Sequence, residues 1–261
     1  MRVLVIGDVF SGLGCDFLKR TLPKIKREEN IDLTIVNGEN SAEGNGITPH
    51  SANEIFAAGA DVITGGNHSL RRKEFHSFLD ENEFVLRPEN FTSCEIGKGY
   101  TEIDLGYTRA AVINLSGKIY FEDKTIGNPF TTADELIEKA KRNGIKNIFV
   151  DFHAEATSEK RAMGFYLDGR VSAVFGTHTH VQTADEQILP KGTGYITDLG
   201  MTGVKNSVLG VKSEIIIERL KSNDMSKFIA AEGECMLNGC IFDIKIGTNA
   251  VKNSEYALVT D

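Results

Sequence analysis

The sequence has 261 residues, with no tryptophan and only four cysteines. The cysteines, at positions 15, 94, 235 and 240, form no CxxC pair, which excludes a disulfide-stapled scaffold and fits a reducing cytoplasm. No apolar run reaches the ~18–20 residues needed to cross a bilayer. Asp8 interrupts the apolar start before it attains the length of a signal peptide. We therefore expect a cytoplasmic protein with no membrane attachment.

Several catalytic motifs are missing as well. The chain contains no GxxxxGK[ST], HExxH or GxSxG sequence, so the motifs of P-loop enzymes, zincins and α/β-hydrolases are absent. Gly12-Leu13-Gly14 does not begin a dinucleotide-binding fingerprint, because Phe17 stands where the third glycine is required. The segment 153–155 has the H-x-E pattern of zinc deaminases, but the accompanying PCxxC is absent.

Positive charge is scarce. Lysine and arginine number 29 against 37 acidic residues, which gives a net charge of −8. Proteins that bind a nucleic-acid backbone usually have a positive balance or a clustered basic face. The longest basic run, at 24–27, is followed at once by Glu28 and Glu29 and is typical of a solvated helix end. RNA is therefore not indicated as a partner, whereas a small phosphorylated ligand remains compatible with the charge.

The chain alternates short apolar strands with helices. We predict strands at 3–6, 33–36 and 61–64, and helices over 15–29, 49–58 and 71–82. A hairpin is predicted over 100–115, a helix from a Thr132–Glu135 capping box to Asn143, and strands at 147–151 and 171–175. Strand-like alternation begins near Ser226. Without repeats or a low-complexity linker, the sequence favours one α/β domain, residues 1–261, with two sheets.

Polar side chains of one chemical kind follow five of the predicted strands. In open α/β sheets, the carboxyl ends of the strands face the crevice where ligands bind, so we expect these side chains to share one rim. Carboxylate, amide and imidazole groups bind hard or borderline metal ions. The residues, in chain order, are Asp8, Glu39, Asn40, Asn67, His68, His153, His178 and His180.

The spacing of these residues suggests phosphoryl-transfer chemistry. His178 and His180 are two apart, so on an extended backbone both rings would point to one metal ion or to two adjacent ones. A carboxylate such as Glu39 can bridge two ions, and two ions about 3.5–4 Å apart clamp the attacking and leaving oxygens of a phosphoryl transfer. Each of these residues, considered alone, has a structural alternative. Asp8 could cap a helix, and segments 38–40 and 65–67 could be ordinary turns or loops. We interpret His50 and His76 as ordinary residues of polar helices.

The same segments match a known superfamily. Residues 7–8, 37–40, 66–68, 153 and 176–180 resemble the sequence blocks of calcineurin-like metallophosphoesterases. More closely, segments 150–160, 168–174, 176–186 and 196–203 resemble the bacterial YmdB-like branch of that superfamily. The resemblance extends over essentially the whole chain.

The resemblance implies a fold, an activity and a ligand set. The fold is a four-layer α-β-β-α sandwich with two metal ions per chain, iron or manganese, between the sheets. The activity is hydrolysis of phosphodiesters, with 2′,3′- or 3′,5′-cyclic nucleotides as small-molecule substrates attacked by a metal-bound hydroxide. His68 would be the general acid, a role that suits histidine because its pKa lies near neutral pH. One ion would be held by Asp8, Glu39, Asn40 and His180, and the other by Glu39, Asn67, His153 and His178.

Two positions depart from the wider pattern. The histidine of the usual Asp-x-His is missing after Asp8, as in the YmdB-like branch, and Asn40 is available to compensate. Soon after the Asn-His pair, that branch usually has an aromatic residue and an acid or amide, whereas this chain has Ser69-Leu70-Arg71-Arg72. We favour solvated helix charges over phosphate contacts for the two arginines. Two alternative functions remain: a non-catalytic nucleotide- or RNA-binding regulator that senses through its metal site, or a phosphomonoesterase. A homo-oligomer is compatible with the sequence.

Overall fold

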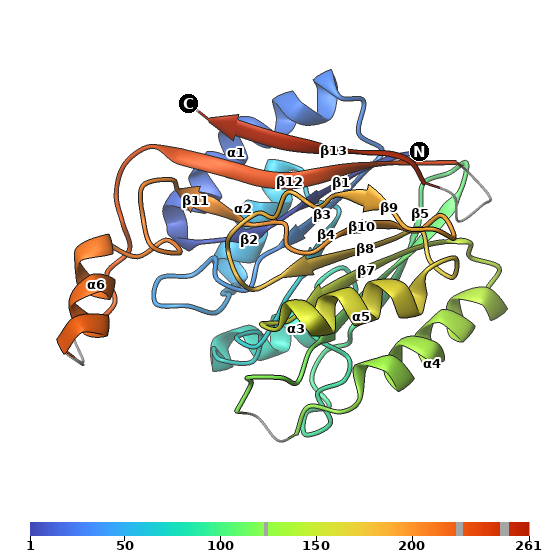
Figure 1. Cartoon of the computed structure of the whole chain (residues 1–261), viewed down its shortest axis with the longest axis horizontal. Coiled ribbons are helices and arrows are strands. Elements are labelled where there is room, and N and C mark those ends of the chain that lie inside the picture. The colour runs from blue at the N-terminus through green and yellow to red at the C-terminus, as the bar shows by residue number, and fades with distance from the viewer. Residues whose placement is uncertain (123–124, 223–226, 246–250, 261) are drawn as a thin grey trace.

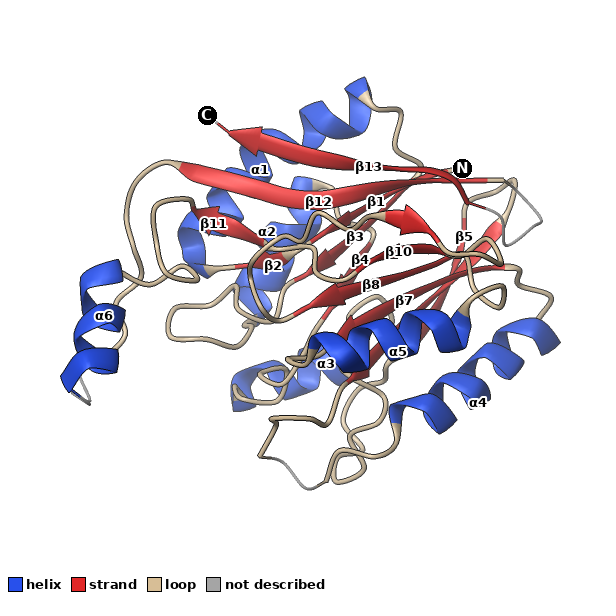
Figure 2. Cartoon of the chain, in the orientation of Figure 1, coloured by secondary structure: helices blue, strands red, loops and turns tan. Residues whose placement is uncertain are grey.

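Two mixed β-sheets form the centre of the molecule (Figure 2). The computed structural model describes residues 1–122, 125–222, 227–245 and 251–260. In these ranges the first sheet has the strand order β2-β11-β12-β1-β3-β4, with β13 paired to β12, and the second has the order β5-β6-β7-β8-β10-β9. The first sheet consists of β1 (Arg2–Ile6), β2 (Asp8–Val9), β3 (Leu33–Asn37), β4 (Val62–Thr64), β11 (Met201–Val204), β12 (Cys235–Ile244) and β13 (Val251–Thr260). The second consists of β5 (Tyr100–Asp104), β6 (Arg109–Ser116), β7 (Asn147–His153), β8 (Ala173–Thr177), β9 (Gln187–Ile188) and β10 (Gly194–Ile196).

Helices cover the outer face of each sheet (Figure 1). Helices α1 (Ser11–Glu28) and α2 (Pro49–Ala58) pack on the first sheet, followed by a 3-10 turn (Lys73–Phe75) and α3 (His76–Glu81). Helices α4 (Pro129–Arg142) and α5 (Thr157–Leu167) pack on the second sheet. The resulting order, helix–sheet–sheet–helix, is the predicted four-layer α/β sandwich.

Side chains alternate between the two faces of the first sheet, so a hydrophobic core lies on each of its faces. Leu4 and Ile6 of β1 point to the helices of the first sheet, whereas Val3 and Val5 point to the second sheet. Successive side chains of a strand face opposite ways, so a strand buried on both faces is apolar at every position. The inter-sheet core is completed by residues of the second sheet such as Val112 and Phe175.

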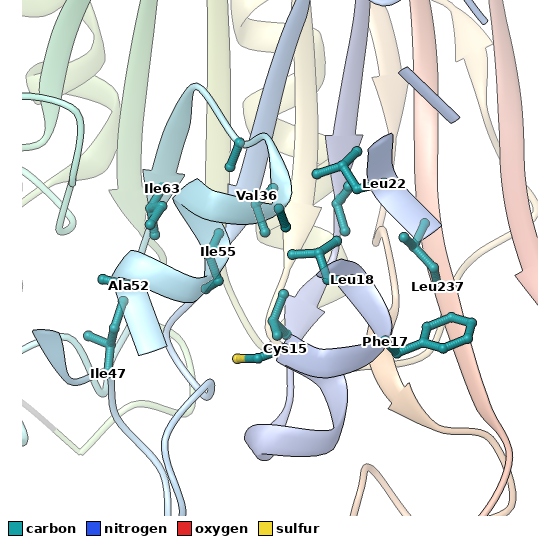
Figure 3. Close-up of a cluster of buried hydrophobic side chains, with 14 of the residues drawn as sticks. Cys15, Phe17, Leu18, Leu22, Val36, Ile47, Ala52, Ile55, Ile63 and Leu237 are labelled. Carbon is teal, nitrogen blue, oxygen red and sulfur yellow. The ribbon is translucent and has the colours of Figure 1, made fainter. Parts of the chain in front are cut away.

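Helices α1 and α2 share one hydrophobic core with the first sheet (Figure 3). Phe17, Leu18 and Leu22 of α1 are fully buried and lie with Ile55 of α2 against the sheet. Thr48 caps α2 through a hydrogen bond from the Ser51 backbone amide, and Pro49 occupies its first turn, as the sequence predicts.

Several element boundaries differ from the prediction. Helix α1 begins at Ser11 rather than at residue 15, and the expected helix over 71–82 is a 3-10 turn followed by the shorter α3. The predicted Thr132–Glu135 capping box is wrong, because Asn128 caps α4 and Pro129 begins it one turn earlier. Ser226 lies outside the described residues.

Helix α6 (Ser213–Ser222) was not predicted, and it lies apart from the sheets (Figure 1). None of its residues is buried. In the part of the chain that the structure describes, no helix is long and apolar enough to span a membrane.

Candidate metal centre

The predicted site residues come from strand ends that meet where the two sheets face each other. Asp8 lies in β2, Glu39 and Asn40 follow β3, and Asn67 follows β4 on the first sheet. On the second sheet, His153 ends β7, and His178 and His180 follow β8. We call Asp8, Glu39, Asn40, Asn67, His153, His178 and His180 the acid–histidine cluster.

One half of the cluster surrounds Nε2 of His153. This atom lies 2.9 Å from Oδ1 of Asn67, 3.1 Å from Nδ1 of His178 and 3.4 Å from Oε1 of Glu39. Ligand atoms of Glu39, His153 and His178 all lie within 4.8 Å of one another, so the three can hold one metal ion. His153 and Glu39 are essentially inaccessible to solvent.

The other half surrounds Nε2 of His180. This atom lies 3.6 Å from Oδ1 of Asp8 and 3.3 Å from Nδ2 of Asn40. The same Asn40 nitrogen lies 2.8 Å from Oε1 of Glu39, so the Glu39 carboxylate faces both halves. Exchange of the Asn40 amide atoms would turn its oxygen, the atom that binds cations, toward His180.

The charges and buried atoms of the cluster fit a bound cation. Oδ1 of Asp8 is buried and has no hydrogen-bond partner, which is costly for a carboxylate unless a cation compensates it. Burial opposes ionisation of Asp8 and Glu39, but the nearby His180 and His153 hold the pKa of each carboxyl below its ordinary value. The donor set contains only oxygen and imidazole nitrogen, which suits hard or borderline metal ions.

The pKa values of His153 and His178 are shifted in opposite directions. Burial alone would lower the pKa of His153, but the Glu39 and Asp8 carboxylates outweigh it and raise the pKa to about 9. Burial and the charge of His153 together lower the pKa of His178 to about 3. The Glu39 and Asp8 carboxylates therefore favour positive charge at this point of the cluster.

The His178–His180 segment is a turn, so the expectation of an extended backbone is wrong. His178 has φ 100° and His180 has φ 62°, values that L-residues adopt only when their surroundings hold them. The Asp198 carboxylate holds the turn by accepting hydrogen bonds from the Thr179 amide and hydroxyl at 3.1 and 2.7 Å. As a result, Nδ1 of His178 faces His153, whereas Nε2 of His180 faces Asp8.

The Asp198 carboxylate is itself held by Lys160 of α5. The two charges lie 2.6 Å apart, and both side chains are almost fully buried. Oδ1 of Asp198 also accepts a hydrogen bond from the Gly200 amide at 2.8 Å. This buried ion pair connects α5 to the turn that carries the two histidines.

A threonine and an aspartate orient His153. Nδ1 of His153 lies 2.9 Å from Oγ1 of Thr177, and this hydroxyl donates to Oδ1 of Asp151 at 2.7 Å. Because the only hydroxyl hydrogen goes to Asp151, the Thr177 oxygen accepts from Nδ1–H, which leaves Nε2 free to bind a cation. We did not predict these roles; the signal was the strand alternation that puts Asp151 on the same face as His153.

Glu155 contacts the cluster from outside. One of its carboxylate oxygens lies 3.0 Å from Nε2 of His178, so Nδ1 of this histidine is the atom directed at the cluster. A carboxylate behind a ligand histidine fixes the ring orientation and raises its basicity. The H-x-E pattern at 153–155 was the available signal, but Glu155 acts on His178 rather than in deaminase chemistry.

His68 lies beside the cluster, and the two arginines take different positions. The His68 amide donates to Oε2 of Glu39 at 3.0 Å, and burial lowers the pKa of the His68 ring.

Arg72 donates to the carbonyls of Asn45, at 3.0 Å, and Glu43, so it holds a loop rather than lying on a solvated helix face. Arg71 is exposed, as favoured from the sequence, but it lies in a bend before the 3-10 turn rather than on a helix. The His76 ring donates a hydrogen bond from Nε2 to the Leu70 carbonyl oxygen at 3.1 Å.

Solved structures define the class of the fold. A crystal structure of a hypothetical protein from Thermus thermophilus has a TM-score of 0.92 and 37% identity, with 100% of each chain covered. A crystal structure described as a novel phosphatase, from Mycoplasma pneumoniae, has a TM-score of 0.93 and 33% identity, covering 100% of this chain and 93% of that one. Together with the two mixed sheets, these matches confirm the predicted α/β sandwich of metallophosphoesterase type.

The family follows from the sequence match. The model of the YmdB-like protein family matches residues 4–256. The chain is 48% identical over 262 residues to a Bacillus subtilis (strain 168) protein named 2′,3′-cyclic-nucleotide 2′-phosphodiesterase, covering 100% of this chain and 98% of that protein. The chain therefore belongs to the YmdB-like family, as its motifs predict.

Proposed function

We propose that this protein is a metal-dependent phosphodiesterase that hydrolyses 2′,3′-cyclic nucleotides. The observation that carries the proposal is the position of Glu39, whose buried carboxylate faces two sets of ligand-type side chains. The 48% identity to a protein named for this reaction supports the choice of substrate. In the reaction, water adds across the bond between phosphorus and O2′, giving a nucleoside 3′-phosphate and a free 2′-hydroxyl.

The residues would divide between two metal ions. Asp8, Asn40 and His180 would hold one, Asn67, His153 and His178 the other, and Glu39 would bridge them. Iron or manganese is the metal that the resemblance to the YmdB-like branch implies, and the oxygen and imidazole donors are compatible with either. When bound, the ions would lower the pKa of a coordinated water and neutralise charge on the phosphoryl oxygens.

His68 would deliver the proton that the leaving oxygen needs. Its amide is fixed to Glu39 at 3.0 Å, so the ring is held beside the place where the phosphate would bind. Burial lowers the pKa of His68 in the free protein, and the negative charge of a bound phosphodiester would raise it again.

The remaining residues would keep the ligands in place. The Thr177–Asp151 pair fixes the His153 ring, and Glu155 fixes the His178 ring. The Lys160–Asp198 ion pair holds the turn between His178 and His180. Ligands held in this way need little rearrangement when an ion binds.

A substrate panel tests the proposal. Protein of measured metal content is incubated with 2′,3′- and 3′,5′-cyclic AMP and with 2′-AMP, 3′-AMP and 5′-AMP, and the products are identified by chromatography. We expect turnover of 2′,3′-cyclic AMP to 3′-AMP. Metal-loaded protein that binds but does not convert the cyclic nucleotides would favour the non-catalytic regulator, and preferential turnover of the monoesters would favour the phosphomonoesterase.

A further inference from the structure

A cavity of about 690 Å³ opens directly beside the acid–histidine cluster. Asn67 and His178 of the cluster form one wall, so a substrate whose phosphate lies at the cluster has its remaining atoms next to this space. The volume lies within the roughly 300–1,000 Å³ typical of small-molecule sites. The cavity therefore has the place and the size for the rest of a nucleotide.

The walls farther from the cluster are aromatic and apolar. Phe91, Tyr120, Phe121 and Ile126 line them. The Phe121 ring meets the edge of the His178 ring, with the ring centroids 5.0 Å apart, and thus links the aromatic wall to the cluster. Flat aromatic surfaces of this kind stack on nucleobases irrespective of base identity, because every base has a π-face.

Tyr120 is exposed to solvent, and its backbone has a conformation that is unusual for a large residue. Its side chain is 81% exposed, and its backbone has φ 69°, a left-handed value that is unfavourable for a bulky residue. The Glu159 carboxylate of α5 fixes the preceding backbone by accepting hydrogen bonds from the amides of Lys118 and Ile119 at 3.0–3.1 Å. The chain thus presents an aromatic ring to solvent at the cavity from a fixed backbone.

The charge of the cavity selects which part of a ligand can enter. Among the described residues that line it, the charged side chains are Glu122 and Glu155, and none is lysine or arginine. Two carboxylates repel a phosphate but accept hydrogen bonds from the amino groups of a neutral base. The anionic part of a nucleotide therefore belongs at the cluster, and its uncharged base belongs in the cavity.

We propose that this cavity is the nucleobase subsite, in which the base stacks on Tyr120 and Phe121. The inference rests on the proposed hydrolysis of cyclic nucleotides and adds where the base binds. A second cavity, of about 310 Å³, is lined by Glu39, His68 and His180 of the site and also by Phe10, Leu209 and Phe228. It is the competing position for the base, and Phe228, 50% exposed, is its most accessible aromatic side chain.

Steady-state kinetics test the subsite with 2′,3′-cyclic AMP and with 1-O-methylribose 2′,3′-cyclic phosphate, which has no base. Tyr120→Ala should lower the ratio of kcat/KM for the nucleotide to that for the base-free compound by roughly 5- to 30-fold, mainly through KM, as expected for a lost stacking contact. Tyr120→Phe should restore the ratio. Tyr107→Ala removes a comparably exposed tyrosine from the distant β5–β6 turn and should leave the ratio unchanged.

An unchanged ratio in Tyr120→Ala, or a fall in Phe228→Ala in its place, would overturn the proposal. Saturation-transfer NMR with adenosine, which has no phosphate, separates this outcome from failure of the proposed function. Transfer to the base protons that is lost in Tyr120→Ala supports the subsite even if no cyclic nucleotide is hydrolysed. Hydrolysis without such transfer contradicts the subsite and leaves the activity standing.

Discussion

The hydroxyl of Thr177 lies 2.9 Å from Nδ1 of His153, on the side of the ring that faces away from Asn67 and His178. The hydroxyl hydrogen is directed to Asp151, so Thr177 acts on the ring as an acceptor only. Nε2 of His153 is thereby kept without a proton whenever the ring is neutral. We therefore expect cation binding at the cluster to depend on Thr177, which contacts His153 on the side away from the other ligands.

Replacement of Thr177 tests this dependence. Thr177→Val removes the hydroxyl at nearly constant volume and should weaken metal binding by roughly 10–100-fold, the usual effect of losing a partner behind a ligand histidine. Thr177→Ser keeps the hydroxyl and serves as the matched control. Competition with a chromogenic chelator measures the affinity, and equal affinity in the valine variant and the natural protein would refute the role.

The buried Lys160–Asp198 pair should contribute to stability. Lys160→Met leaves the Asp198 carboxylate buried without its cation and should lower the free energy of unfolding by about 3–5 kcal/mol. Lys205 pairs with Glu234 at 3.9 Å on the surface, and Lys205→Met should cost about 0–1 kcal/mol. Urea unfolding measures both, and similar losses in the two variants would contradict the special position of Lys160.

Metal uptake should be coupled to proton release. The pKa of His153 is raised to about 9 by the carboxylates around it, so in the metal-free protein this histidine is protonated at pH 7. An ion can bind only when Nε2 gives up its proton, so affinity should rise with pH from 7 toward 9 and level off above it. Calorimetry in buffers of different ionisation enthalpy should detect the proton released, and a heat independent of buffer would contradict the protonated state.

His68 should matter for turnover but not for metal content. It lies beside the acid–histidine cluster, and its ring nitrogen is 3.4 Å from the Asn67 amide. His68→Ala should reduce turnover of 2′,3′-cyclic AMP by roughly 10²–10⁴-fold, the usual contribution of a general acid. His50→Ala removes an exposed histidine of α2 and is the control. Full activity of His68→Ala would reject the acid assignment.

The position of the site could be predicted because its residues lie at the ends of strands. Asp8, Glu39, Asn67 and His153 each follow or end an apolar run, and parallel strands deliver such residues to one edge. The two sheets followed from the alternation of strands and helices in the same way. These features are set by local sequence patterns.

Other features could not be predicted, and the clearest case depends on contacts between distant segments. The backbone at His178 and His180 is bent around Thr179, which is held by Asp198, and Asp198 is held by Lys160. Nothing in the spacing of two histidines encodes those partners. Helix α6 was not predicted, and none of its residues is buried. The start of α4 was misplaced because two candidate caps lie four residues apart, and Asn128 with Pro129 prevails.

The central claim is that Glu39 is shared by two metal ions, and counting the metal in purified variants tests it most directly. Glu39→Gln removes the proposed bridge, Asp8→Asn alters one set of ligands, and His153→Asn alters the other. Elemental analysis after loading and desalting should find about two ions per chain in the natural protein. The account predicts loss of both ions in Glu39→Gln and of one ion in each of the other variants. Retention of two ions by Glu39→Gln would contradict it.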